Sequence, residues 1–176
     1  MADRPKAIDC WLNPTTGVSD YRPEFLVRVA RDYFKREKEM FAHTPLEELL
    51  AQMGAAGVER AIITMDDHQP EPIHEIARSF PGKFICSAVI ARRPVWTPSA
   101  WSTAWSRSTH APKYLPAELI QFMNTRGQHK VLFASDHPVL PFERCLAEAA
   151  ALPFREGVLE KYLRENALAV FRWDSA

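Results

Sequence analysis

Short apolar runs alternate with amphipathic stretches through the first half of the chain. Three runs have the length and apolar content of buried strands: residues 6–12, 60–65 and 83–90. Three other stretches repeat apolar positions at a helical spacing: residues 23–41, 44–57 and 73–80. Strands and helices that alternate in this way form βαβ units. The pattern therefore predicts an α/β fold in which a parallel sheet is flanked by helices.

The helix predicted over residues 44–57 has the clearest boundary signals. Thr44 is a candidate N-cap, Pro45 suits the first helical position, and Glu47 has the spacing of a capping box. Gly54 or Gly57 can end the helix, because glycine adopts the left-handed conformation readily.

The second half of the chain returns to regular patterns after an interruption. Its predicted elements are helices over residues 116–125, 142–152 and 156–171 and a fourth strand over residues 131–134. The interruption, ARRPVWTPSAWSTAWSRSTH at residues 91–110, contains three of the five tryptophans and no acidic residue, and it fits neither period. A loop of this length is uncommon inside a compact domain. We interpret the chain as one domain over residues 1–176 with an atypical Trp-, Ser- and Arg-rich insert at residues 91–110.

The composition argues against several classes of partner. Hydrophobic residues make up 47% of the 176, and 22 Lys and Arg balance 22 Asp and Glu. A chain without net charge has no overall basic field, so we expect no nucleic acid and no membrane as a partner. No apolar run approaches the ~20 residues of a membrane-spanning helix, and the N-terminus lacks the layout of a signal peptide. Three widely separated cysteines favour a reducing, cytoplasmic compartment.

The strongest candidate for chemistry follows the fourth predicted strand. Residues 131–134 run directly into Ser135, Asp136, His137 and Pro138. An ionisable side chain directly after a buried apolar run makes Asp136 a candidate for a functional carboxylate. The alternative is structural, since an aspartate at this place can form an Asx-turn or cap the next helix.

Two C-terminal segments carry a resemblance to a known family. FASDHPVLPFERCLAE and KYLRENALAVF, at residues 133–148 and 161–171, resemble the end of the amidohydrolase-related family (amidohydrolase 2). That family comprises metal-dependent (β/α)8 barrels, including the aminocarboxymuconate-semialdehyde decarboxylase-like enzymes. The resemblance implies a TIM-barrel-like fold, a divalent metal such as zinc, and hydrolysis or decarboxylation of a small organic substrate. It also implies that Asp136 is a metal ligand or the general base.

The sequence departs from the family pattern in two ways. The positions of the first-strand His-x-His motif hold Trp11 and Asn13; tryptophan cannot ligate a cation, and asparagine is a weak ligand for zinc. The second departure is length, because a (β/α)8 barrel typically takes ~250 residues. We therefore expect a truncated barrel in which residues 91–110 mark the junction of a large internal deletion.

Two interpretations of function stay open at this point. In the first, the chain is a hydrolase by lineage, with Asp136 as the catalytic group and with substrate-binding residues Trp11, Asn13, His110 and His137. In the second, it is a catalytically inactive, truncated family member that serves as a binding or oligomerising module. Missing barrel strands leave sheet edges exposed, and exposed edges favour association into a homo-oligomer.

Overall fold

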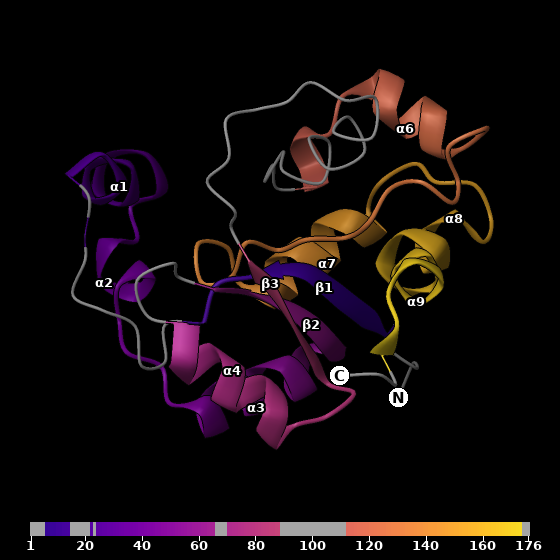
Figure 1. The fold of residues 1–176 in the computed structure, drawn as a ribbon. Helices are drawn as coiled ribbons and strands as arrows, with labels where there is room; N and C mark the ends of the chain where they lie inside the picture. Colours follow the sequence, from indigo (N-terminus) through magenta and orange to yellow (C-terminus); the bar gives the residue numbers. More distant parts are fainter. Residues whose placement is uncertain (1–5, 15–21, 23, 66–69, 89–111, 174–176) are drawn as a thin grey trace, which may run out of the picture.

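A parallel three-stranded sheet forms the centre of the protein. The computed structural model describes residues 6–14, 22, 24–65, 70–88 and 112–173. The strands are β1 (Ala7–Leu12), β2 (Val58–Met65) and β3 (Phe84–Ala88), in the order β1-β2-β3, and both neighbouring pairs are parallel. Helices lie on either side of the sheet (Figure 1). The predicted α/β class with a parallel sheet and flanking helices is confirmed.

Short helices connect and cover the strands. Before the second strand these are α1 (Glu24–Arg28), the π-helix η1 (Val29–Phe34), α2 (Glu37–Met40) and α3 (Leu46–Ala56). Between the second and third strands lies α4 (Pro70–Ser79). The C-terminal part contributes the 3-10 turn η2 (Pro112–Tyr114), α6 (Ala117–Met123), α7 (Phe142–Ala150), α8 (Val158–Glu160), the π-helix η3 (Lys161–Glu165) and α9 (Asn166–Val170). Within the described residues, no helix is long and apolar enough to cross a membrane.

Helix α3 differs from its prediction at its start and agrees at its end. Its N-cap is Pro45, with no side-chain cap hydrogen bond, so the capping box predicted from Thr44 and Glu47 is wrong in its placement. Gly57 follows the last turn with φ 88°, and its backbone N–H donates to the carbonyl of Gly54 at 3.2 Å. A side chain would be strained at that φ, which explains the glycine.

The single helix predicted over residues 23–41 is broken in the structure. Lys35 adopts a left-handed φ of 56° and separates η1 from α2. Phe25 and Val29, two apolar positions of the helical pattern, are 63% and 38% exposed. The amphipathic pattern therefore predicted helical structure correctly but not its continuity.

The fourth predicted strand runs beside β1 without forming a regular ladder. The backbone N–H of Cys10 donates to the carbonyl of Phe133 at 2.9 Å, and that of Asn13 donates to the carbonyl of His137 at 2.9 Å. An isolated parallel bridge joins Leu12 and His137. The backbone N–H of Phe133 instead donates to the carbonyl of Tyr162 at 3.1 Å. Because η3 takes this donor, residues 131–134 pair with β1 at isolated positions only, and the prediction of a regular strand is wrong.

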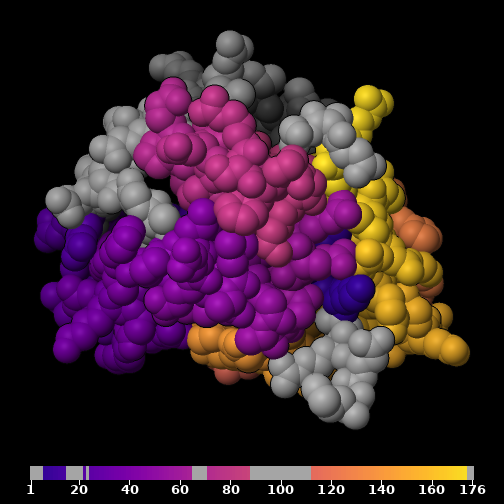
Figure 2. Space-filling view, turned by 90° about the horizontal axis from the view of Figure 1, so that it is seen from below, coloured from indigo at the N-terminus to yellow at the C-terminus, as the bar shows by residue number. Residues whose placement is uncertain are grey.

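Both faces of the sheet are packed. The larger cluster contains buried side chains of all three strands together with those of α3, α4, α7 and η3. On the other face, Ile8 and Ile62 pack against Ala167 and Trp173. Figure 2 shows the C-terminal helices (yellow) directly beside the N-terminal half of the chain (purple and magenta) on the face seen from below. The C-terminal helices thus complete the core around β1, and this fixes the position of the segment that carries Asp136.

Candidate active site at the end of β1

A buried aspartate ties the segment at residues 135–137 to the end of β1. The Asp9 side chain is 0% exposed, and its Oδ1 accepts hydrogen bonds from the backbone N–H of Ser135 at 3.0 Å and of Trp11 at 3.1 Å. The Ser135 hydroxyl donates to Asp9 Oδ2. The same hydroxyl oxygen accepts the backbone N–H of His137 at 3.0 Å. Asp9 and Ser135 together therefore fix the backbone on both sides of Asp136.

Asp136 is directed at Asn13, the residue that follows β1. The Nδ2 of Asn13 donates to Oδ1 of Asp136 at 2.7 Å, across 123 residues of sequence. Asp136 adopts a left-handed φ of 58°, a conformation that aspartate tolerates better than most residues. Its backbone N–H donates to the carbonyl of Trp11 at 3.1 Å. Backbone and side-chain hydrogen bonds thus hold the Asp136 carboxylate in one orientation.

Burial changes the acidity of both carboxyl groups. It raises the pKa of Asp136 to about 6, against hydrogen bonds from the Asn13 and Trp11 side chains that lower it. Burial likewise raises the pKa of Asp9 to about 6, while the hydrogen bonds from Ser135 and Trp11 oppose the shift. Asp136 is the more accessible of the two, because its residue is half-buried and Asp9 is fully enclosed. Only Asp136 is therefore placed to exchange a proton with a bound molecule.

His137 lies next to Asp136 in sequence but points to a different part of the protein. Its ring stacks on Phe142 with centroids 4.1 Å apart and planes 7° from parallel. No described group hydrogen-bonds its buried Nδ1. Burial, with the charge of Arg36, lowers the pKa of His137 to about 4, so the ring is neutral at physiological pH.

The His137 ring lines a cavity of about 320 Å³ between α2, α3 and the start of α7. The other lining residues are Arg36, Glu39, Ala42, Thr44, Glu48, Gln52, Pro138, Pro141, Phe142 and Glu143. Asp136 does not line it. The imidazole therefore lines a cavity to which the Asp136 carboxylate does not contribute.

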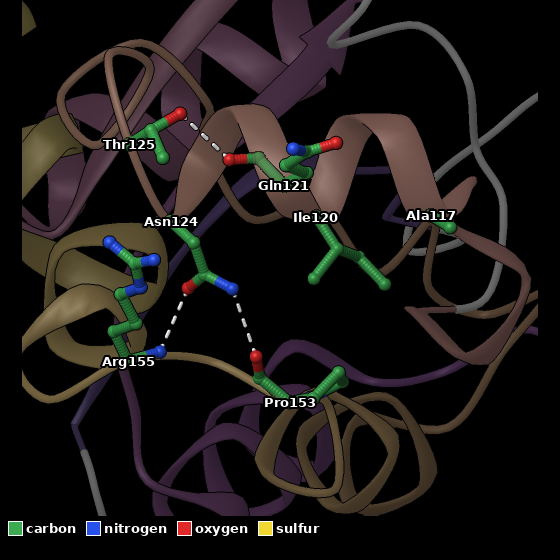
Figure 3. A pocket seen from close by; sticks show the side chains of 7 residues that line it. All are labelled: Ala117, Ile120, Gln121, Asn124, Thr125, Pro153 and Arg155. Carbon is green, nitrogen blue, oxygen red and sulfur yellow. Dashed lines mark hydrogen bonds between the residues drawn. The ribbon is translucent and has the colours of Figure 1, made fainter.

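A second cavity, of about 280 Å³, lies between α6 and the loop before α8 (Figure 3). The side chain of Asn124 crosses it, donating to the carbonyl of Pro153 at 2.9 Å and accepting the backbone N–H of Arg155 at 2.8 Å. Thr125 donates to the carbonyl of Gln121 at 2.8 Å. These polar groups are used to fasten the loop to α6, so this cavity has a structural role.

The structure brings together three of the residues predicted from the sequence. Asp136, Trp11 and Asn13 meet at the end of β1, whereas His137 faces the separate cavity beside Phe142. His110 lies outside the described residues, as does the insert at residues 91–110. The assignment of these residues to catalysis and substrate binding stays a prediction.

Sequence reasoning assigned no role to Asp9 and Ser135, which organise the site. An acidic residue inside an otherwise apolar strand is a signal that could have identified Asp9, because a buried carboxylate requires hydrogen-bond partners. Ser135 adjoins Asp136 and, at 1% exposed, has no other way to satisfy its hydroxyl than a buried acceptor.

The described side chains do not fit a divalent cation at Asp136. No group of three or more His, Cys, Asp or Glu residues suitable for a metal occurs among the residues that the structure describes. Trp11 offers only an N–H donor, and Asn13 presents its amide N–H to the carboxylate. We therefore derive no catalytic step through a cation.

Comparison with known proteins gives one match. The family model described as Amidohydrolase matches residues 25–173. No curated protein and no solved structure matches the chain. The matched stretch includes Asp136 and all the C-terminal helices, and it begins after β1.

Proposed function

Because the chain belongs to the amidohydrolase family, we propose that it acts on a small organic substrate at the end of β1, by hydrolysis or decarboxylation. Family membership supports a hydrolase-like function and a TIM-barrel-like fold. The observation that carries the proposal is the Asp136 carboxylate, which lies within the matched stretch, is half-buried, and is held in one orientation by Asn13.

In this proposal Asp136 acts as the general base of a hydrolytic reaction. Its carboxylate accepts a proton from a water molecule while the water oxygen attacks the substrate carbonyl, and the proton then passes to the leaving group. A pKa of about 6 suits this role, because the group is mostly ionised at neutral pH and still basic enough to accept a proton. Trp11 and Asn13 form the adjoining wall and hold the carboxylate.

The test is a substrate screen with a matched pair of variants. We expect the wild type to turn over a member of a panel of small esters, amides, lactones and carboxylic acids. Asp136→Asn should reduce kcat by about 10²–10⁴-fold, the usual contribution of a general base. Asp32→Asn, at an aspartate whose side chain is 56% exposed, should leave kcat unchanged. Equal turnover by wild type and a folded Asp136→Asn variant would refute the role of Asp136.

A second candidate function is binding without catalysis, and the hydrogen bond between Asn13 and Asp136 favours it. That bond satisfies one carboxylate oxygen within the protein, at 2.7 Å, so a ligand must compete for it. A protein of this kind would bind members of the same panel saturably and leave them unchanged. Mass spectrometry of the recovered ligand distinguishes the two functions, because only catalysis changes the mass of the ligand. Sedimentation velocity shows whether the protein self-associates.

A further inference from the structure

We infer that Asn13, with Trp11, occupies the place that a cation would take beside Asp136, so that direct hydrogen bonds hold this carboxylate and it binds no divalent metal. The inference does not depend on the proposed catalytic activity. It concerns how the site is held together, and it predicts metal content and stability.

The geometry of the pair leaves no room for a bridging ion. Two ligand atoms of a tetrahedral zinc, each ~2.0–2.2 Å from the metal, lie about 3.3–3.6 Å apart, whereas Asn13 Nδ2 and Asp136 Oδ1 are only 2.7 Å apart. The amide hydrogen already occupies that space. An ionised carboxylate can only accept, so the amide must present its NH2 group and not its oxygen. The hydrogen-bonded pair therefore takes the place of a metal bridge, and it is not a metal site waiting for its cation.

The backbone fixes the two side chains face to face. The carbonyl of Trp11 accepts the N–H of Asp136 at 3.1 Å, and the N–H of Asn13 donates to the carbonyl of His137 at 2.9 Å. These bonds set the register on both sides of the pair. The hydrogen bonds between Asp9 and Ser135 hold the same segment against β1. These bonds fix the backbone positions from which Asn13 and Asp136 project, so the two side chains are kept within hydrogen-bonding distance of each other.

The Trp11 side chain contributes a second donor. Its hydrogen bond lowers the pKa of Asp136 in the same sense as that from Asn13. Two neutral donors thus stabilise the carboxylate charge, which is the electrostatic task that a cation performs in a metal site. Both donors, Trp11 and Asn13, are neutral.

The experiment measures zinc directly in five proteins, each spanning the same 176 residues. These are the wild type, Asp136→Ala, the double variant Trp11→His/Asn13→His, the same double variant with Asp136→Ala added, and the control Asn124→His, which adds an imidazole at an asparagine that pairs with Pro153 and Arg155. Each is treated with chelator, incubated with zinc chloride, passed through gel filtration and analysed by elemental mass spectrometry. Thermal midpoints are recorded with zinc and with chelator.

We expect the wild type and Asn124→His to retain no stoichiometric zinc and to show the same Tm in zinc and in chelator. The double variant should gain stoichiometric zinc, and a Tm increase of about 5–10 °C in zinc a hundredfold above its Kd. Adding Asp136→Ala to it should abolish both gains. Zinc retained equally by the wild type and Asp136→Ala would show that the metal lies away from Asp136, and the inference would stand.

Stoichiometric zinc in the wild type that is lost in Asp136→Ala would overturn the inference. So would a folded double variant that gains no zinc, because Trp11 and Asn13 would then not lie at a potential cation position. Circular dichroism establishes that each variant is folded. None of these outcomes depends on turnover, so failure of the catalytic proposal and failure of this inference can be told apart.

Discussion

The buried carboxyl group of Asp9 makes the stability of this protein depend on pH in a specific direction. Its side chain is 0% exposed, and burial raises its pKa from 3.8 to about 6. Between about pH 4 and pH 6, Asp9 therefore keeps its proton in the folded protein and loses it in the unfolded chain. We expect stability from this group to be highest below about pH 4, to fall as the pH rises to about 6, and to be level above that.

The size of the effect follows from the two pKa values. The difference between about 6 and 3.8, at about 1.4 kcal/mol for each pKa unit, corresponds to about 3 kcal/mol in the free energy of unfolding. Asp9→Asn removes the ionisation while Oδ1 can still accept the two backbone N–H groups. The free energy of unfolding of this variant, relative to wild type, should therefore rise by about 2–2.5 kcal/mol between pH 4 and pH 7, which is most of the full difference.

The comparison must be made between variants, because other groups titrate in the same range. Asp136 also has a pKa raised to about 6 and adds a loss of stability with rising pH. His137 acts in the opposite direction: its pKa falls from 6.5 to about 4, so its contribution is lost as the pH falls through this range. The wild-type profile alone therefore cannot isolate Asp9.

The assay is urea unfolding followed by circular dichroism at several values between pH 4 and pH 7.5, for wild type, Asp9→Asn and the control Asp32→Asn. Asp32 is on the surface, so its variant should follow the wild-type profile. If the difference between Asp9→Asn and wild type stays constant with pH, then Asp9 ionises in the folded protein without a penalty. Burial would then not raise the pKa of Asp9.

Three further predictions concern the same junction, and urea unfolding tests each of them. Ser135→Ala leaves an acceptor of Asp9 and the backbone N–H of His137 unpaired, and should cost about 1–3 kcal/mol; a cost near zero would mean that the hydroxyl is dispensable. Asn166→Ala removes donors to the carbonyls of Gln128 at 2.9 Å and Val131 at 2.8 Å, and should cost a similar ~1–3 kcal/mol; an unchanged urea midpoint would contradict it. His137→Phe keeps the ring stack on Phe142, and its free energy of unfolding relative to wild type should rise as the pH falls from 6.5 to 4; a difference that stays constant with pH would contradict this.

Periodicity predicted the elements that bury a continuous apolar face. The strands β1, β2 and β3 and the helix α3 appear close to their predicted ranges, because each contributes several side chains to one core cluster. The elements that differ are those whose structure depends on distant partners. Residues 131–134 lack a regular ladder because the carbonyl of Tyr162 takes the N–H of Phe133, and no local pattern encodes that competition.

The candidate site shows the same division between local and distant information. The place of Asp136 directly after an apolar run was predictable, because polar residues follow buried strands at sheet edges. Its pairing with Asn13 was not, since the two residues are 123 positions apart and meet only when residues 135–137 align with β1. The buried pair of Asp9 and Ser135 spans 126 positions and was missed for the same reason.

The two parts of the site carry different kinds of support. The family match covers residues 25–173, so it includes Asp136 but not β1 or the residues that follow it directly. The departures from the family pattern, Trp11 and Asn13, therefore lie outside the part of the chain on which membership rests. A carboxylate within the matched stretch and a partner that replaces a cation are compatible in one protein. The metal-binding experiment tests the role of Trp11 and Asn13, and the turnover experiment tests the role of Asp136. The two experiments together can therefore reveal catalysis without a bound cation.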